Sequence, residues 1–213
     1  MKRTITPALL VALVLVTGLV GYGCSTLQGI GAALGSLKKM QFQLGDVNGL
    51  RLNGIDVSRI NRVSDVGPMD MVRLGHAIAS KSLPMEFTLN VLAKNPNDGA
   101  SGTKATPLYL SRLDWRMKID GRETVSGVVN KKLEIPGSGQ TTTIPLTVQM
   151  DLFKFFGDKG VDDLVNLAVA LGGSKGSSSR IELLAKVQVD VPGIGPINYP
   201  GEISIVDKQF SNP

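Results

Sequence analysis

The chain has 213 residues, of which 42% are hydrophobic and 5% aromatic, and a formal net charge of +5 from 23 basic and 18 acidic residues. Nucleic-acid binding normally needs a concentrated basic face with aromatic platforms. Beyond residue 3 the only adjacent basic pairs are Lys38-Lys39 and Lys131-Lys132, and there is one tryptophan. Composition therefore excludes nucleic acid as a partner.

The first residues have the pattern of an export signal. Lys2 and Arg3 precede an uncharged apolar run at 8–20, ALLVALVLVTGLV. A helix that spans a bilayer needs about 20 apolar residues, so this run is short for a permanent anchor and typical of a secretory signal. We predict that residues 1–23 are a signal peptide.

Cys24 is the only cysteine, and small residues stand before it at Gly21 and Gly23. This junction resembles the lipobox of bacterial lipoproteins, where the cysteine receives diacylglycerol, the chain is cut before it and the new amine is acylated. The usual lipobox has Leu and then Ala or Ser where this chain has Gly21 and Tyr22. The alternative is an ordinary cleaved signal that leaves an unpaired thiol. We predict lipidation of Cys24, because two or three acyl chains give stable anchoring.

The predicted lipid anchor determines where the mature chain is expected to be located. It also determines whether a disulfide can contribute to its stability. By resemblance to lipoproteins of enteric bacteria, Ser25 after the cysteine favours the outer membrane, so we expect a lipid-anchored protein on the periplasmic face of a bacterial cell envelope. Loss of Lys2 and Arg3 leaves 21 basic against 18 acidic residues. With Cys24 lipidated no disulfide can form, so the fold must rest on its core.

Residues 24–40 are predicted to be a tether. They carry apolar residues at helical spacing, but three glycines weaken a helix by about 1 kcal/mol each. The alternative is an apolar stripe that lies on the membrane or on the domain. The residues of this stripe are Leu27, Ile30, Leu34 and Leu37.

From Phe42 the hydrophobic period changes to two, which predicts strands. Asn48-Gly49 and Asn53-Gly54 are expected to be turns between short strands. A helix is predicted over 68–80, with Pro68 in its first turn. Met71, Leu74 and Ile78 fall on one face of this helix.

Further strands follow in alternation. The segment 84–94 ends at Asn95-Pro96-Asn97, and 108–129 is predicted to be a hairpin that turns at Asp120-Gly121. A helical insertion near 152–172 precedes the last strands. Strands with one apolar and one polar face are typical of antiparallel sheets, so we predict a mainly β protein, an antiparallel β-sandwich over 41–213 with two short helical insertions. The expected inward rows are Met85, Phe87, Leu89, Val91 and Ala93; Leu113, Trp115, Met117 and Ile119; Ile144, Leu146, Val148 and Met150; and the helical positions Leu164, Leu167, Ala168 and Leu171.

Three runs carry a family resemblance: EFTLNVLAKNPN, PLYLSRLDWRMKIDGRETVSGVV and LEIPGSGQTTTIPLTVQMDL. Together they resemble the late embryogenesis abundant type 2 family, also called the water-stress and hypersensitive-response (WHy) domain, over residues 42–206. The best mark is Asn95-Pro96-Asn97 after an alternating strand. The resemblance implies a fibronectin-like or immunoglobulin-like sandwich and a role in protection under desiccation or stress.

The Asn95-Pro96-Asn97 motif itself needs no activity to explain it. Pro96 cannot donate a ladder hydrogen bond and so ends the strand, and asparagine side chains bond to their own backbone in turns. We predict that these three residues have a structural role.

The sequence offers few candidates for catalytic, metal-binding or phosphate-binding residues. The one histidine, His76, has Ser64 and Asp65 nearby in sequence, but no nucleophile-elbow motif surrounds Ser64. Asp162 and Asp163 are explained by the start of a helix, where acidic residues are favoured, better than by calcium. The glycine-rich runs GSGQTTT and GGSKGSSS lack the spacing of a phosphate-binding loop. We therefore predict no catalytic residue, no metal and no cofactor, and a protein that is not an enzyme.

The prediction for function is a non-enzymatic, membrane-anchored lipoprotein whose sandwich is a binding module, with a link to stress or desiccation tolerance. The alternatives are a carrier of a small apolar ligand and a structural component of an envelope complex. The partner is expected to be another protein or an apolar ligand. A groove could lie between the sheets or beneath the inserted helix at Phe153, Phe155 and Phe156, although core packing is the more frequent role of such residues.

Overall fold

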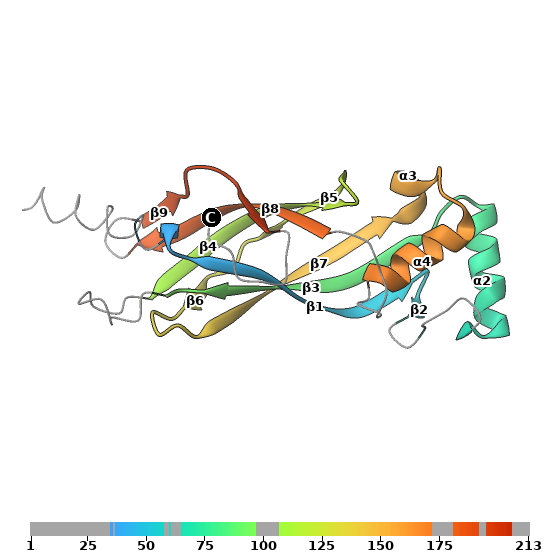
Figure 1. The fold of residues 1–213 in the computed structure, drawn as a ribbon, viewed down its shortest axis with the longest axis horizontal. Helices are drawn as coiled ribbons and strands as arrows, with labels where there is room; N and C mark the ends of the chain where they lie inside the picture. The colour runs from blue at the N-terminus through green and yellow to red at the C-terminus, as the bar shows by residue number, and fades with distance from the viewer. Residues whose placement is uncertain are drawn as a thin grey trace, which may run out of the picture.

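The computed structural model describes residues 35, 37–57, 60, 65–96, 107–171, 181–191 and 195–205. They form two antiparallel sheets packed face to face, which confirms the predicted β-sandwich (Figure 1). The first sheet has the order β2-β1-β3-β7, and the second has the order β10-β8-β4-β5, with β6 also paired to β4 and β9 to β8. The strands of the first sheet are β1 (Gln41–Leu52), β2 (Ile55–Asp56), β3 (Pro84–Lys94) and β7 (Thr141–Asp151). Those of the second are β4 (Leu108–Ile119), β5 (Arg122–Val129), β6 (Leu133–Ile135), β8 (Ile181–Val191), β9 (Gly195–Asn198) and β10 (Ile203–Ile205).

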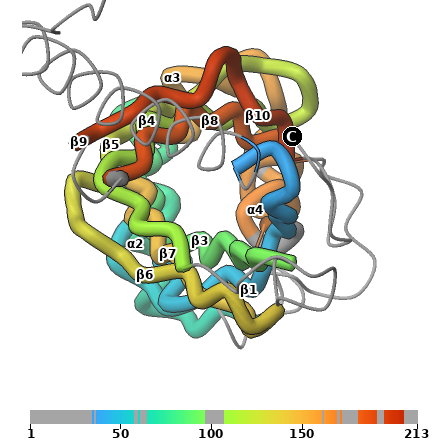
Figure 2. The backbone as a smooth tube through the Cα atoms, turned by 90° about the vertical axis from the view of Figure 1, so that its left-hand side faces the viewer, coloured from blue at the N-terminus to red at the C-terminus, as the bar shows by residue number. Residues whose placement is uncertain are grey.

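The core lies between the sheets and is made mainly by alternating residues of the long strands β1, β3, β4 and β7. Figure 2 shows the backbone of the two sheets nearly end-on, with β4, β8 and β10 on one side and β1, β3 and β7 on the other. The predicted inward rows of β3, β4 and β7 are all buried, as are the four predicted helical positions. Burial of one large apolar side chain contributes about 1.5 to 3 kcal/mol. These rows are therefore the main source of stability in a chain that cannot form a disulfide.

Two predicted turns are confirmed and a third is wrong. Asn53-Gly54 and Asp120-Gly121 have positive φ at both positions, 49° and 78° in the first and 51° and 79° in the second, as a two-residue hairpin turn requires. At Asn48-Gly49, by contrast, β1 continues as one strand. Gly49 has a φ of 61° next to a shift in register between Asn48 and Arg51. The freedom of this pair to adopt positive φ produces a β-bulge here instead of a turn.

Three helices lie together at one end of the sandwich (Figure 1). They are α2 (Pro68–Ala79), α3 (Leu152–Phe156) and α4 (Val161–Leu171). The helix predicted over 68–80 is confirmed as α2. The second insertion, predicted as one helical segment, contains two helices because the chain turns at Gly157, which follows α3 directly.

The sandwich is elongated, and β1 runs along its length towards the helices (Figure 1). A strand of 12 residues rises about 3.3 Å per residue and so spans about 40 Å. Leu37 and Met40, which belong to the segment predicted as a tether, are each only 1% exposed and part of the core. The chain thus enters the domain at the end opposite the helices.

Candidate functional site

Helix α2 lies crosswise at the far end of the molecule, and local contacts fix its position. Pro68 occupies its first turn, and Leu74 and Ala77 are its buried residues. At the other end the Ser80 hydroxyl donates to the carbonyl oxygens of His76 and Ala77, at 2.9 and 3.0 Å. The Asn53 side chain donates to a carbonyl in the middle of the helix, which ties α2 to the turn between β1 and β2.

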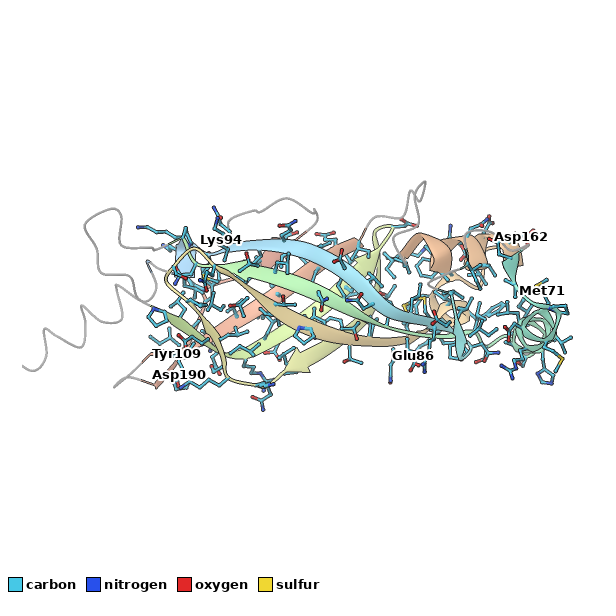
Figure 3. The ribbon with its side chains drawn as sticks, turned by 90° about the horizontal axis from the view of Figure 1, so that it is seen from below. Met71, Glu86, Lys94, Tyr109, Asp162 and Asp190 are labelled. Carbon is cyan, nitrogen blue, oxygen red and sulfur yellow. The ribbon has the colours of Figure 1, made fainter. Side chains whose placement is uncertain are left out.

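The outer side of α2 exposes three apolar side chains, which we name the tip face: Met69 (76% exposed), Met71 (45%) and Val72 (71%). Figure 3 shows Met71 at one end of the molecule and Lys94, Tyr109 and Asp190 at the other. Of the predicted apolar face, Leu74 is buried and Ile78 packs partly against the core, whereas Met71 is 45% exposed. The signal for the tip face was present in the sequence as apolar residues on both sides of one short helix.

A carboxylate holds this end of the sandwich together. Asp151, the last residue of β7, accepts hydrogen bonds from the Leu83 and Phe153 backbone N–H groups, both at 2.9 Å, and from the Ser82 hydroxyl at 2.7 Å. Burial raises the pKa of Asp151, but these hydrogen bonds outweigh it and hold the pKa below the ordinary value. The connection from α2 to β3 and the start of α3 therefore share one anchor.

A second contact joins the two sheets at the same end. The Arg122 guanidinium, just after the turn from β4 to β5, donates to both carboxylate oxygens of Asp158 at 2.8 and 2.7 Å, and to the Phe155 carbonyl oxygen at 2.9 Å. It also lies 5.5 Å from the ring centre of Phe156. The hairpin of the second sheet is thus attached to the helical segment that follows the first.

The Arg122–Asp158 pair predicts a specific titration. The hydrogen bonds from Arg122 lower the pKa of Asp158 from 3.8 to about 2. Since the pKa is lowered in the folded state, the contribution of this pair to stability is present above about pH 4 and is lost as the pH falls towards 2. In an NMR titration the Asp158 carboxyl should have its midpoint near 2, and Arg122→Gln should move that midpoint upwards.

The matched control for this titration is Arg73→Gln, which removes a guanidinium from α2 and should leave the Asp158 midpoint unchanged. An Asp158 midpoint that is the same with and without Arg122 would contradict the assigned cause.

A broad depression of about 880 Å³ lies on the outer face of the second sheet, over β4, β5, β8 and the segment before β10. Its lining includes Asp114, Arg116, Lys186, Tyr199 and Glu202. Opposite charges alternate across it, so it offers no concentrated field of one sign. Such a surface suits weak polar contacts better than capture of one small charged ligand.

Ion pairs in and around this depression already satisfy most of its charges. Arg112 donates to Asp114 at 2.8 Å, and this hydrogen bond lowers the pKa of Asp114. Arg116 bridges Glu202 at 2.6 Å and Glu123 at 3.1 Å, and its hydrogen bond lowers the pKa of Glu202. Exposed pairs of this kind contribute little to stability.

Among the described residues, no catalytic group is assembled around the histidine. His76 is exposed on α2 and lines a small depression of about 330 Å³ with Asn53, Arg73, Ser80 and Ser82. Asp65 is described and exposed, whereas Ser64 lies outside the described residues. Within the described ranges, no group of three or more His, Cys, Asp or Glu side chains is placed to hold a metal ion. Asp162 and Asp163 are exposed in the first turn of α4.

The three phenylalanines of the insertion pack inward. Phe156 is fully buried, and Phe153 and Phe155 are half-buried against the core. This confirms that they pack in the core, the more frequent role of such residues. Neither of the two depressions described above is lined by them.

The predicted motif residues fall partly outside the described chain. Asn95 is completely buried directly after β3, and its carbonyl oxygen accepts from the Gly139 N–H at 3.2 Å. Pro96 is half-buried next to it, while Asn97 and Cys24 lie outside the described residues. Of the helices that the structure describes, none is long and apolar enough to cross a bilayer.

Comparison with known proteins gives only distant likenesses. No family model matches the chain, and no curated protein matches it. Several solved structures align with it, including the following three. A protein from Archaeoglobus fulgidus is 12% identical with a TM-score of 0.32, covering 60% of this chain and 86% of its own. An Arabidopsis thaliana protein is 18% identical with a TM-score of 0.37, covering 79% and 81%. A provisionally named late embryogenesis abundant protein is 12% identical with a TM-score of 0.37, covering 100% and 94%. TM-scores of this size do not establish a shared fold, so the architecture rests on the sheets of this chain.

Proposed function

We propose that this protein is a non-enzymatic lipoprotein, anchored through Cys24, that presents the tip face to a protein partner at a distance from its membrane. One observation carries the proposal. The chain enters β1 at one end of the elongated sandwich, and the exposed apolar side chains of α2 lie at the other end (Figures 1 and 3).

The entry point is fixed by packing. Leu37 and Met40 are buried in the core, so the connection to the lipid is limited to residues 25–36. The body then extends about 40 Å along β1 before α2 is reached. A protein tethered by Cys24 would therefore direct the tip face away from the lipid surface.

The tip face has the chemistry of a contact point for another protein. Large apolar side chains that are exposed together in a soluble domain often mark an interaction site. An unbranched methionine adapts to the shape of a partner, and at 3.6 residues per turn Met69 and Met71 flank Val72 around the circumference of the helix. A small apolar ligand has less support, because side chains fill the space between the sheets.

The link to stress or desiccation tolerance stays a prediction of the resemblance to the late embryogenesis abundant type 2 family. It adds no residue to the site. The same tip face would serve a structural component of an envelope complex.

The anchor and the tip are tested separately. Mass spectrometry of the protein from native membranes should show diacylglycerol and an acylated amine on Cys24, and Cys24→Ala should remove both together with membrane retention. A photo-crosslinking residue at Val72 in the anchored protein should give a discrete product, whereas the same residue at Thr147, exposed on the outer face of β7, should not.

An unmodified Cys24 thiol on a freely diffusing protein would overturn the anchor. Equal crosslinking from Val72 and Thr147, or none from either, would overturn the role of the tip face.

A further inference from the structure

We propose that Met69 and Met71 form a methionine-oxidation site, at which an oxidant of the peroxide class converts exposed thioethers to sulfoxides and changes the tip face from apolar to polar. This inference concerns the chemistry of the two side chains. It holds whether or not the tip face has the partner proposed above.

Exposure makes the site selective. Six methionines lie in the described residues, and only Met69 and Met71 are exposed, at 76% and 45%. Met40, Met85, Met117 and Met150 are buried in the core. An oxidant in solution reaches the first two sulfur atoms directly, whereas it reaches the others only when the core opens.

The reaction needs only the peroxide. A lone pair of the thioether sulfur attacks the hydroxyl oxygen of the peroxide, and the O–O bond breaks. That oxygen stays on sulfur, and its proton passes to the leaving oxygen. The sulfur is oxidised by two electrons while the peroxide is reduced to water or an alcohol. The described residues contain no cysteine, so no thiol among them competes for the oxidant. A methionine sulfoxide reductase reverses the change with two thiols, which become a disulfide as the oxygen leaves in water.

The fold tolerates this change because the modified groups are already in solvent. Leu74 and Ala77, on the other side of α2, hold the helix to the body. Arg73 lies one turn after Met69 on the same helix surface. Its side chain is 63% exposed, and its Nη1 lies 3.4 Å from Asp70 Oδ1. A sulfoxide oxygen on Met69 would gain a hydrogen-bond donor in that guanidinium.

Two measurements on the full-length anchored protein in detergent test the site. After brief treatment with hydrogen peroxide, peptide mass spectrometry should show sulfoxide on Met69 and then Met71 at rates at least about tenfold higher than on Met85 and Met117. The treated protein should elute earlier from a hydrophobic-interaction column with an unchanged melting temperature, and a sulfoxide reductase should restore the original elution.

Two variants separate the site from general damage. Met69→Leu/Met71→Leu keeps the tip face apolar, and its elution should not respond to peroxide. Met69→Gln/Met71→Gln should elute early without peroxide.

Equal oxidation rates at exposed and buried methionines would overturn the proposal. A fall in melting temperature with sulfoxide at Met69 would overturn it too, as would an elution shift in the leucine variant. A protein that oxidises selectively but shows no crosslink from Val72 would contradict only the proposed partner.

Discussion

Replacing Gly127 with alanine should lower the free energy of unfolding by about 1 to 3 kcal/mol, the usual cost of adding a methyl group where the core has no room. Gly127 on β5 is directly opposite Trp115 on β4. A Cβ at residue 127 would lie 2.6 Å from Cζ2 and 2.8 Å from Cε2 of the indole. The indole is buried, so it cannot swing into solvent. Urea unfolding followed by the fluorescence of this single tryptophan measures the change.

Gly75→Ala provides the matched control. Gly75 lies in the exposed middle of α2, and no neighbouring atom is within 4 Å of a Cβ built there. The same substitution should therefore stabilise the protein by about 0.5 to 1 kcal/mol, because alanine favours helix. The two changes should shift the urea midpoint in opposite directions.

The steric cause has its own test. Trp115→Phe shortens the ring system, so adding it to Gly127→Ala should recover part of the loss caused by the alanine. Since this variant has no tryptophan, its unfolding is followed by circular dichroism. A Gly127→Ala protein as stable as the parent chain would show that β5 yields easily and that the indole does not depend on the glycine.

The strands were predictable because their signal is local. Alternation at 85–93 and at 113–119 correctly identifies which side chains face the core, since neighbouring residues on a strand point to opposite faces. The two hairpin turns, at Asn53-Gly54 and Asp120-Gly121, are also set by adjacent residues. The sandwich was predictable because several such strands each have one apolar and one polar face, and two sheets of this kind bury their apolar faces against each other.

Features that depend on distant partners were not predictable. Nothing near Asn48-Gly49 shows whether positive φ will reverse the chain or produce a bulge, because the outcome depends on pairing with β3. The need for glycine at 127 arises from an indole on the neighbouring strand. The Asn95 motif was correctly predicted to end a strand, but its bond to Gly139 crosses 43 intervening residues.

The tip face was missed for a related reason. A 12-residue helix with apolar residues on both sides has no unique inward direction, so local spacing favoured Met71, Leu74 and Ile78. The tertiary fold buries Leu74 and Ala77, packs Ile78 partly against the core and leaves Met71 exposed. It leaves Met69 and Val72 in solvent, which only the position of α2 beyond the sheets reveals (Figure 1).

Replacing Asp151 with alanine should lower the free energy of unfolding by about 2 to 4 kcal/mol. Loss of a helix N-cap contributes about 1 kcal/mol. The Leu83 N–H, which belongs to a fully buried residue and donates to this carboxylate at 2.9 Å, would lose its acceptor at a cost of about 1 to 3 kcal/mol. Asp151→Asn keeps one carbonyl oxygen as an acceptor, so it should lose less. Urea unfolding at pH 7 measures the free energy of unfolding of the parent chain and of the two variants.

The contribution of the Asp151 carboxylate to stability should also depend on pH. Because hydrogen bonds lower the pKa of Asp151 in the folded protein, its contribution is present above the unfolded value of about 4 and falls as the pH decreases below that. The alanine variant should therefore lose less stability than the parent chain between about pH 5 and pH 3.

Asp162→Ala distinguishes this anchor from ordinary helix-start charge. Asp162 is exposed in the first turn of α4, where its interaction with the helix dipole contributes only about 0.3 to 1 kcal/mol. Equal losses for the two alanine variants would mean that Asp151 acts through the dipole alone. A larger loss for Asp151→Ala would show that one carboxylate fixes both the connection from α2 to β3 and the start of α3, and so determines where the tip face points.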